Sequence, residues 1–279
     1  MTSSWSSKRR ALAAAALITL AAAVAGAQEQ PGAQDHAELA KQLSNPLASL
    51  VSVPFQFNWE ENVGPSELTR FVLNLQPVMP FTLNDSWNLI ARVIMPFIGQ
   101  PPLAPGGTAT SGISDITTSF FFSPSKSTRF IWGVGPVLVL PSTSEPTLGS
   151  GKWSGGPTIV VLKQTGPWTA GALWNQFWSF VGDATRSDVN QMFLQPFVAY
   201  QATKTLTLTV QSETTANWEA DNGDRWTVPI NVLAAKISTF GVFPASYQFG
   251  FGVFAAHPSA GPTWKIRAAI VVLLPRTKS

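Results

Sequence analysis

The chain has 279 residues, with 18 lysines and arginines, 15 aspartates and glutamates, and no cysteine. Charged residues make up only 12% of it, where about 25% is typical of a soluble domain, and the mean hydropathy is +0.13. The absence of cysteine excludes a disulfide framework and a thiolate metal site.

An export signal opens the sequence. Three basic residues at 8–10 precede the apolar run 11–25, which leads into the small-residue pattern AGA at 25–27. The run is shorter than the about 20 residues that a membrane-spanning helix needs, so we expect residues 1–27 to be cleaved during export. Cleavage removes three basic residues and no acidic one. The remaining chain is then neutral and gives no support for nucleic-acid binding.

A polar segment follows at 28–47. Its sequence HAELAKQLS favours a short helix, which Asn45-Pro46 ends because the residue before a proline avoids the helical conformation. We expect this segment to be a periplasmic N-terminal arm or a small plug of the domain at 48–279.

From residue 48 the hydrophobic period changes to two, which predicts β-strands. In the last strand, for example, Trp264, Ile266 and Ile270 lie on one face, and Lys265 and Arg267 lie on the other. The predicted strands are 48–59, 68–82, 86–98, 113–123, 129–140, 153–163, 168–180, 188–200, 205–218, 226–238, 246–255 and 263–274.

The connections alternate in length. The odd-numbered ones are mostly long and polar, such as 99–112 and 141–152, and the even-numbered ones are mostly short, such as 83–85 and 164–167. Transmembrane barrels have an even number of antiparallel strands, short periplasmic turns and longer outer loops. The pattern therefore predicts an all-β protein, a transmembrane antiparallel β-barrel of about 12 strands.

Tryptophan and proline positions bear on this prediction in opposite directions. Indole rings prefer the membrane–water boundary, and most tryptophans lie at predicted strand ends, which favours a membrane girdle over packing in a soluble core. Proline removes a ladder hydrogen bond, so we interpret the prolines within strands as bulges or kinks that reshape the wall or open it sideways, unless some strands are shorter than drawn. These prolines are Pro54, Pro77, Pro80, Pro96, Pro136, Pro157, Pro196 and Pro229.

The sequence offers little that could carry catalysis. His36 and His257 both lie outside the predicted strands, and Gly-x-Ser-x-Gly is absent, so no nucleophile has an obvious base beside it. Motifs for metal or phosphate binding are also absent from the sequence. We therefore expect no enzymatic activity, no cofactor and no metal.

Charged residues on the polar strand faces point to the predicted lumen, because a charge that faces lipid at mid-depth costs about 2–4 kcal/mol. Arginines that face carboxylates across a narrow lumen would form a selectivity constriction. Alternatively, the charges pair and merely fill a closed interior. The candidate pore-lining residues are Arg70, Asn74, Gln76, Asn88, Arg92, Asp115, Glu213, Lys265 and Arg267.

Several ordered blocks resemble a known family. LAKQLSNPLASLVSVPFQFNWEENVGP, LNLQPVMPFTLNDSWNLIARVIMPFI, FIWGVGPVLVLPS and FLQPFVAY are similar to segments of a bacterial outer-membrane transporter family. That family is grouped with proteins of the phenol-degradation "MetA" pathway, and its members are sometimes mislabelled neuromedin U. The resemblance covers roughly residues 37–275. It implies a barrel that passes small or hydrophobic molecules, without established catalytic residues.

Two functions follow as expectations. The first is an outer-membrane channel or transporter for small molecules, aromatic or otherwise hydrophobic. The alternative is a non-conducting barrel with a structural or surface-binding role. In both, the expected location is the cell outer membrane. The expected partners are outer-membrane lipid, a small-molecule solute and, during biogenesis, the assembly machinery, with no nucleic acid.

Overall fold

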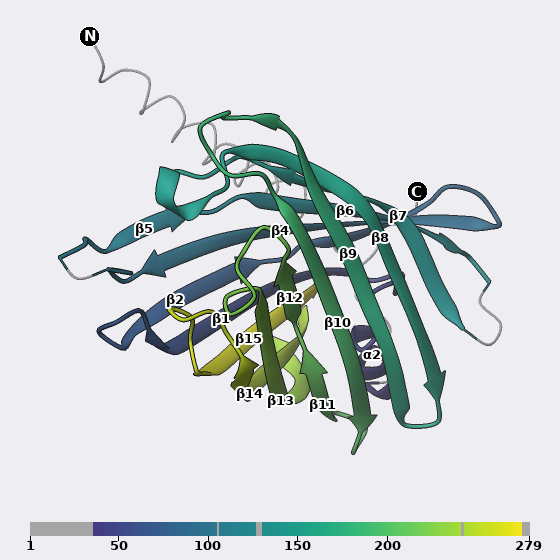
Figure 1. Cartoon of the computed structure of the whole chain (residues 1–279). Coiled ribbons are helices and arrows are strands. Elements are labelled where there is room, and N and C mark those ends of the chain that lie inside the picture. The colour runs from purple at the N-terminus through teal and green to yellow at the C-terminus, as the bar shows by residue number, and fades with distance from the viewer. Residues whose placement is uncertain (1–35, 105, 127–129, 241–242, 275–279) are drawn as a thin grey trace, which may run out of the picture. The chain divides into compact units, whose positions relative to one another are not determined.

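The computed structural model describes residues 36–104, 106–126, 130–240 and 243–274, which form one unit, a rolled-up sheet with a short helix (Figure 1). The export signal predicted at 1–27 and the first part of the arm predicted at 28–47 lie outside the described residues. None of the described helices is long and apolar enough to cross a membrane.

One antiparallel sheet contains all the described strands. The elements are α2 (His36–Leu43), β1 (Val51–Val63), β2 (Leu68–Leu75), β3 (Val78–Thr82), β4 (Trp87–Gln100), β5 (Thr110–Ile113), β6 (Ile116–Pro124), β7 (Ile131–Leu140), the 3-10 helix η1 (Pro146–Leu148), β8 (Lys152–Thr165), β9 (Trp168–Gly182), β10 (Asn190–Gln201), β11 (Leu206–Ser212), β12 (Thr214–Asn217), β13 (Trp226–Phe240), β14 (Phe243–Ala256) and β15 (Trp264–Leu274). The sheet closes into a barrel because β1 pairs with β15 and β9 pairs with β10.

Consecutive segments account for the number of strands. β2 and β3 both pair with β4, as do β5 and β6, while β11 and β12 both pair with β10 and β13. Each of these pairs is therefore one strand with a break in it. The barrel has twelve antiparallel strands, which confirms the predicted fold class.

The predicted strand ends are close to the observed ones, with the largest difference in the first strand. The pattern predicts 48–59, whereas β1 runs from Val51 to Val63. Two acidic residues, Glu60 and Glu61, suggested a loop. The strand continues through them because Glu60 faces Arg70 in β2, where an opposite charge holds it.

The two faces of the wall differ in polarity. In β15, Lys265, Arg267, Ala269 and Leu273 are buried, while residues that alternate with them, such as Trp264, Ile266 and Ile270, are more exposed. The same alternation leaves large apolar side chains such as Phe249 (63% exposed) and Val232 (59%) on the outer face. The charged residues of the last strand therefore face inward, as the period of two predicts.

Two of the prolines disturb the ladder. Pro77 lies in the break between β2 and β3, and the register between β13 and β14 shifts at Pro229. Others stay within paired strands: Pro54 faces Val271 across β1 and β15, and Pro136 faces Pro157 across β7 and β8.

Two ends of the barrel can be distinguished by their connections. The short-turn end carries 83–86, 166–167 and 202–205, and the long-loop end carries connections such as 141–151 and 183–189. We call the corresponding halves of the lumen the short-turn half and the long-loop half.

Helix α2 lies within the short-turn half of the lumen (Figure 1). Leu39 and Ala40 pack against Ile237 of β13 and Leu273 of β15, two inward-facing residues. The carbonyl oxygen of Lys41 accepts a hydrogen bond from Gln164 Nε2 at 2.9 Å, beside the turn between β8 and β9. The helix therefore contacts strands on different sides of the barrel.

The segment after α2 continues across the lumen. The helix ends before Asn45, whose Oδ1 accepts a hydrogen bond from the backbone N–H of Leu47 at 2.9 Å. Leu47 packs into an apolar cluster with Ile90, Phe121, Val160, Leu162 and Leu173, which come from four strands. A Cβ atom at position 133 would lie 3.1 Å from a Leu47 methyl carbon, so the glycine at this point of β7 makes room for the leucine.

Candidate functional site

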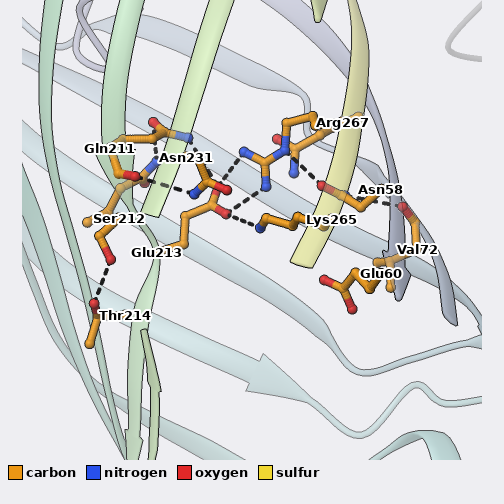
Figure 2. A network of polar contacts seen from close by, with 12 residues as sticks. Asn58, Glu60, Val72, Gln211, Ser212, Glu213, Thr214, Asn231, Lys265 and Arg267 are labelled. Carbon is orange, nitrogen blue, oxygen red and sulfur yellow. Dashed lines mark hydrogen bonds and ion pairs between the residues drawn. The ribbon is translucent and has the colours of Figure 1, made fainter. Parts of the chain in front are cut away.

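A buried charged cluster occupies the long-loop half of the lumen (Figure 2). Its centre is Glu213, which lies in the break between β11 and β12. Arg267 binds it through two nearly parallel hydrogen bonds, Nη1 to Oε1 at 2.8 Å and Nη2 to Oε2 at 2.6 Å. Lys265 Nζ donates to Oε2 at 3.1 Å. The two-pronged geometry is the strongest that an arginine makes with a carboxylate.

Neighbouring amides fix the cluster further. Arg267 Nε donates to Asn58 Oδ1 at 2.8 Å, and Asn58 Nδ2 donates to the carbonyl oxygen of Val72 at 3.2 Å. Gln211 Nε2 reaches Glu213 Oε1 at 3.4 Å. The Arg267 and Lys265 side chains are only 3% and 4% exposed. All three kinds of donor on Arg267 are thus engaged, and the guanidinium is held in one orientation.

A second polar layer lies between this cluster and α2. Arg92 Nη2 donates to Gln76 Oε1 at 2.7 Å, and Gln76 Nε2 reaches Gln56 Oε1 at 3.4 Å. Gln195 Nε2 donates to Gln211 Oε1 at 3.2 Å, which joins this layer to the charged cluster. Within the described part of the chain, no carboxylate lies within 4.0 Å of the Arg92 guanidinium.

A cavity of about 270 Å³ separates the second layer from α2 and the segment after it. Both apolar and polar side chains line the cavity. Its apolar part includes Leu173, Phe197, Leu233 and Val271, and its polar part includes Gln76, Arg92, Gln195, Gln211 and Gln248.

Four of the predicted pore-lining residues have no place in either layer. Arg70 is paired with Glu60 at 2.7 Å, with 28% and 12% of the two side chains exposed. Asn74 lies on the same face of β2 as Arg70, and Asn88 on the same face of β4 as Arg92. Asp115 binds the long loop: its Oδ2 accepts hydrogen bonds from the Ser150 backbone N–H at 2.6 Å and hydroxyl at 2.7 Å.

The other five predicted residues come together. Gln76, Arg92, Glu213, Lys265 and Arg267 form the two layers described above. The prediction placed Asp115 and Glu213 well inside strands, whereas both lie in breaks, between β5 and β6 and between β11 and β12. A break lets a residue leave the alternation of the strand.

Sequence reasoning missed several amides of the site. Asn58, Gln56, Gln195, Gln211 and Gln248 all lie in or beside the two layers, but none was among the predicted pore-lining residues. The available signal was the position of these amides on polar strand faces, the same signal that predicted Gln76.

The long loops carry a separate charged contact. Lys152 Nζ binds Asp188 Oδ1 at 2.6 Å, and Ser179 also donates to that oxygen. The hydrogen bond and charge of Lys152 lower the pKa of the Asp188 carboxyl below its ordinary value. Asp183, in the same loop, has a pKa lowered mainly by the hydrogen bonds from Thr185.

The fold and interior define a class of structure: a closed antiparallel β-barrel with an apolar outer wall, a charged lumen and an internal helix. No family model matches the chain, and no curated protein matches it. The outer-membrane transporter family inferred from the sequence blocks therefore stays a prediction.

Solved structures share this architecture. The COG4313 outer membrane channel from Pseudomonas putida F1 matches 82% of this chain and 97% of its own length, with a TM-score of 0.61 and 16% identity. The NanC porin matches 81% of this chain and 100% of its own, with a TM-score of 0.53 and 10% identity. These likenesses show a shared fold.

Outer membrane phospholipase A from Escherichia coli has a TM-score of 0.47 with 11% identity, over 87% of this chain and 99% of its own. Because neither a family model nor a curated protein matches the chain, the predicted lack of enzymatic activity stays a prediction.

Proposed function

We propose that this protein is an outer-membrane channel for small molecules, aromatic or otherwise hydrophobic. One observation carries the proposal: a closed barrel, apolar outside, encloses a polar lumen with a cavity between its charged layers and an internal helix. A barrel satisfies every backbone hydrogen bond within the wall, which is what a lipid environment demands.

Aromatic side chains support the membrane location. At the short-turn end, Trp168 contacts Tyr200 at 4.7 Å between ring centroids, and Trp87 contacts Trp132 at 6.0 Å. At the long-loop end, Trp218 and Trp226 form a third pair. These tryptophans are between 38% and 51% exposed. Two belts of exposed indoles, one at each end, suit the two boundaries of a bilayer.

The remaining expectations on biogenesis form part of the same proposal. Residues 1–27 would direct export and be removed, and the assembly machinery of the outer membrane would insert the barrel at 48–279. Lipid would then surround the apolar wall.

In this proposal residues 28–47 act as a plug. The described part of this segment is held by apolar contacts and by two hydrogen bonds from glutamine side chains, Gln164 to Lys41 and Gln201 to Ala37. Such contacts can be exchanged without unfolding a strand. Solute would pass after α2 moves, along the nine predicted pore-lining residues.

The proposal is tested by single-channel recording in planar bilayers with the full mature chain. We expect conductance steps for the wild type and larger steps when residues 36–47 are deleted, because the short-turn half of the lumen is then open. Leu39→Asn together with Leu47→Asn weakens the same contacts at constant chain length and should also enlarge the steps.

Glu38→Ala serves as the control, since Glu38 is an exposed residue of α2 and should leave the steps unchanged. If the wild type and both plug variants stay silent although they are inserted, the channel function is wrong.

A non-conducting barrel is the second candidate, and the filled short-turn half favours it. Silent bilayers combined with a binding phenotype that is lost on loop deletion would decide for this alternative.

A further inference from the structure

Arg92 is the one inward-facing cation of the described strands that lacks an acidic partner. Arg70 is paired with Glu60, and Lys265 and Arg267 share Glu213. The Arg92 guanidinium has one protein hydrogen bond, to Gln76. A guanidinium carries five N–H donors, so most of those on Arg92 have no acceptor among the described residues.

Glu213 attracts Arg92 only at a distance and forms no ion pair with it. Its two oxygens already accept four hydrogen bonds, two from Arg267, one from Lys265 and one from Gln211. The middle of the lumen therefore holds three cations, Arg92, Lys265 and Arg267, and one carboxylate, which leaves a formal charge of +2. A buried charge is costly unless it is paired, so this part of the lumen favours an added anion.

The cavity beside Arg92 has the size and lining for such a ligand. Its volume of about 270 Å³ is below the range of about 300–1,000 Å³ that holds drug-sized molecules. Phe197, Leu173 and Leu233 offer apolar walls, while Gln195 and Gln248 offer amide groups. A ligand with an apolar body and one anionic end matches this division of the cavity lining.

We propose that the cavity binds a small monocarboxylate with an apolar body, such as an aromatic acid, with its carboxylate on the Arg92 guanidinium. The planar fork of the guanidinium fits a carboxylate through two hydrogen bonds. A neutral aromatic molecule of the same size fills the apolar part but leaves Arg92 unpaired. The site thus prefers the acid over its neutral analogue.

The proposal rests on the channel function only for the route by which the ligand arrives, and it names the solute class. Binding is measured on the detergent-solubilised mature chain by calorimetry, with benzoate and benzyl alcohol as the probes. We expect benzoate to bind the wild type and benzyl alcohol to bind much more weakly. Arg92→Gln should weaken benzoate binding by about ten-fold or more, since it removes the charged donor.

Lys236→Gln provides the matched control. It removes the same charge from an exposed position on the outer face of β13 and should leave benzoate binding unchanged. Arg92→Lys keeps the charge without the fork and should retain part of the affinity. Heat-modified migration on gels verifies that each variant is folded.

Equal binding of benzoate and benzyl alcohol, unchanged binding in Arg92→Gln, or no benzoate binding to the folded wild type overturns the site. Such a result with normal conductance leaves the channel function standing. Benzoate binding that depends on Arg92, together with silent bilayers, supports the site and overturns the channel function.

Discussion

At the scale of single residues, Glu213 holds the charged cluster of the lumen together. It is the acceptor for two nearly buried cations that come from a strand more than 50 positions away in the sequence. In surroundings of low dielectric, removal of one partner leaves the others as uncompensated buried charges. The cluster therefore matters to stability mainly because loss of Glu213 would leave two buried cations without an anion.

Glu213→Gln should lower the free energy of unfolding by about 3–5 kcal/mol, because Lys265 and Arg267 stay buried without an anion. The measurement is the urea midpoint of the barrel in detergent, followed by tryptophan fluorescence. Glu60→Gln is the comparison, since its partner Arg70 is 28% exposed and water can replace the lost contact. There we expect a loss of about 1 kcal/mol. Equal losses for the two variants would contradict this account.

At the residue scale, the sequence predicted which way the charged side chains point, but it did not predict which residues they pair with. The period of two placed Lys265, Arg267 and Arg92 on inward faces, and the structure agrees. Which acid each would meet depends on the stagger of a closed barrel. Arg267 contacts Asn58, 209 positions away, and no local pattern encodes that contact.

At the scale of elements, alternation was informative because a wall between lipid and a polar lumen needs it in every strand. HAELAKQLS followed by Asn45-Pro46 predicted the helix and its end, and α2 spans His36–Leu43. The breaks after Ile113 and Ser212 went unpredicted. They serve Asp115 and Glu213, whose partners come from distant parts of the chain.

The connection 183–189 provides a test with pH. The lowered pKa of Asp188 means that its contact with Lys152 stabilises the loop above the ordinary value of 3.8 and is lost as the pH falls through the lowered value. An NMR titration of the Asp188 carboxyl should give a midpoint below 3.8.

Lys152→Met should move that midpoint back towards the ordinary value, since Lys152 is the main cause of the shift. Asp183 should keep a low midpoint in the same variant, because Thr185 causes most of its shift. A midpoint for Asp188 that does not respond to the substitution would show that the contact is absent in solution.

At the scale of the whole molecule, the charges of the lumen set a preference between ions. Arg70 and Glu60 cancel, and the middle of the lumen keeps a surplus of two positive charges. If the barrel conducts, ions pass within a few ångströms of these charges. Over such a short distance salt screens the charges only weakly.

We expect the open channel, with residues 36–47 deleted, to prefer chloride over potassium in a salt gradient. The reversal potential reports this preference, and Arg92→Gln should reduce it because one of the surplus charges is removed. A reversal potential of the opposite sign would refute the assignment of these cations to the conducting path.

Helix α2 also joins the two edges that close the cylinder. It is attached through residues 44–50 to β1, yet its apolar side packs against Ile237 and Leu273, which belong to β13 and β15. The first and last strands, β1 and β15, pair with each other along one seam. The apolar side chains of α2 pack on the β15 side of this seam. Displacement of α2 to admit solute would remove this apolar packing, whereas the paired residues of β1 and β15 would still hold the seam.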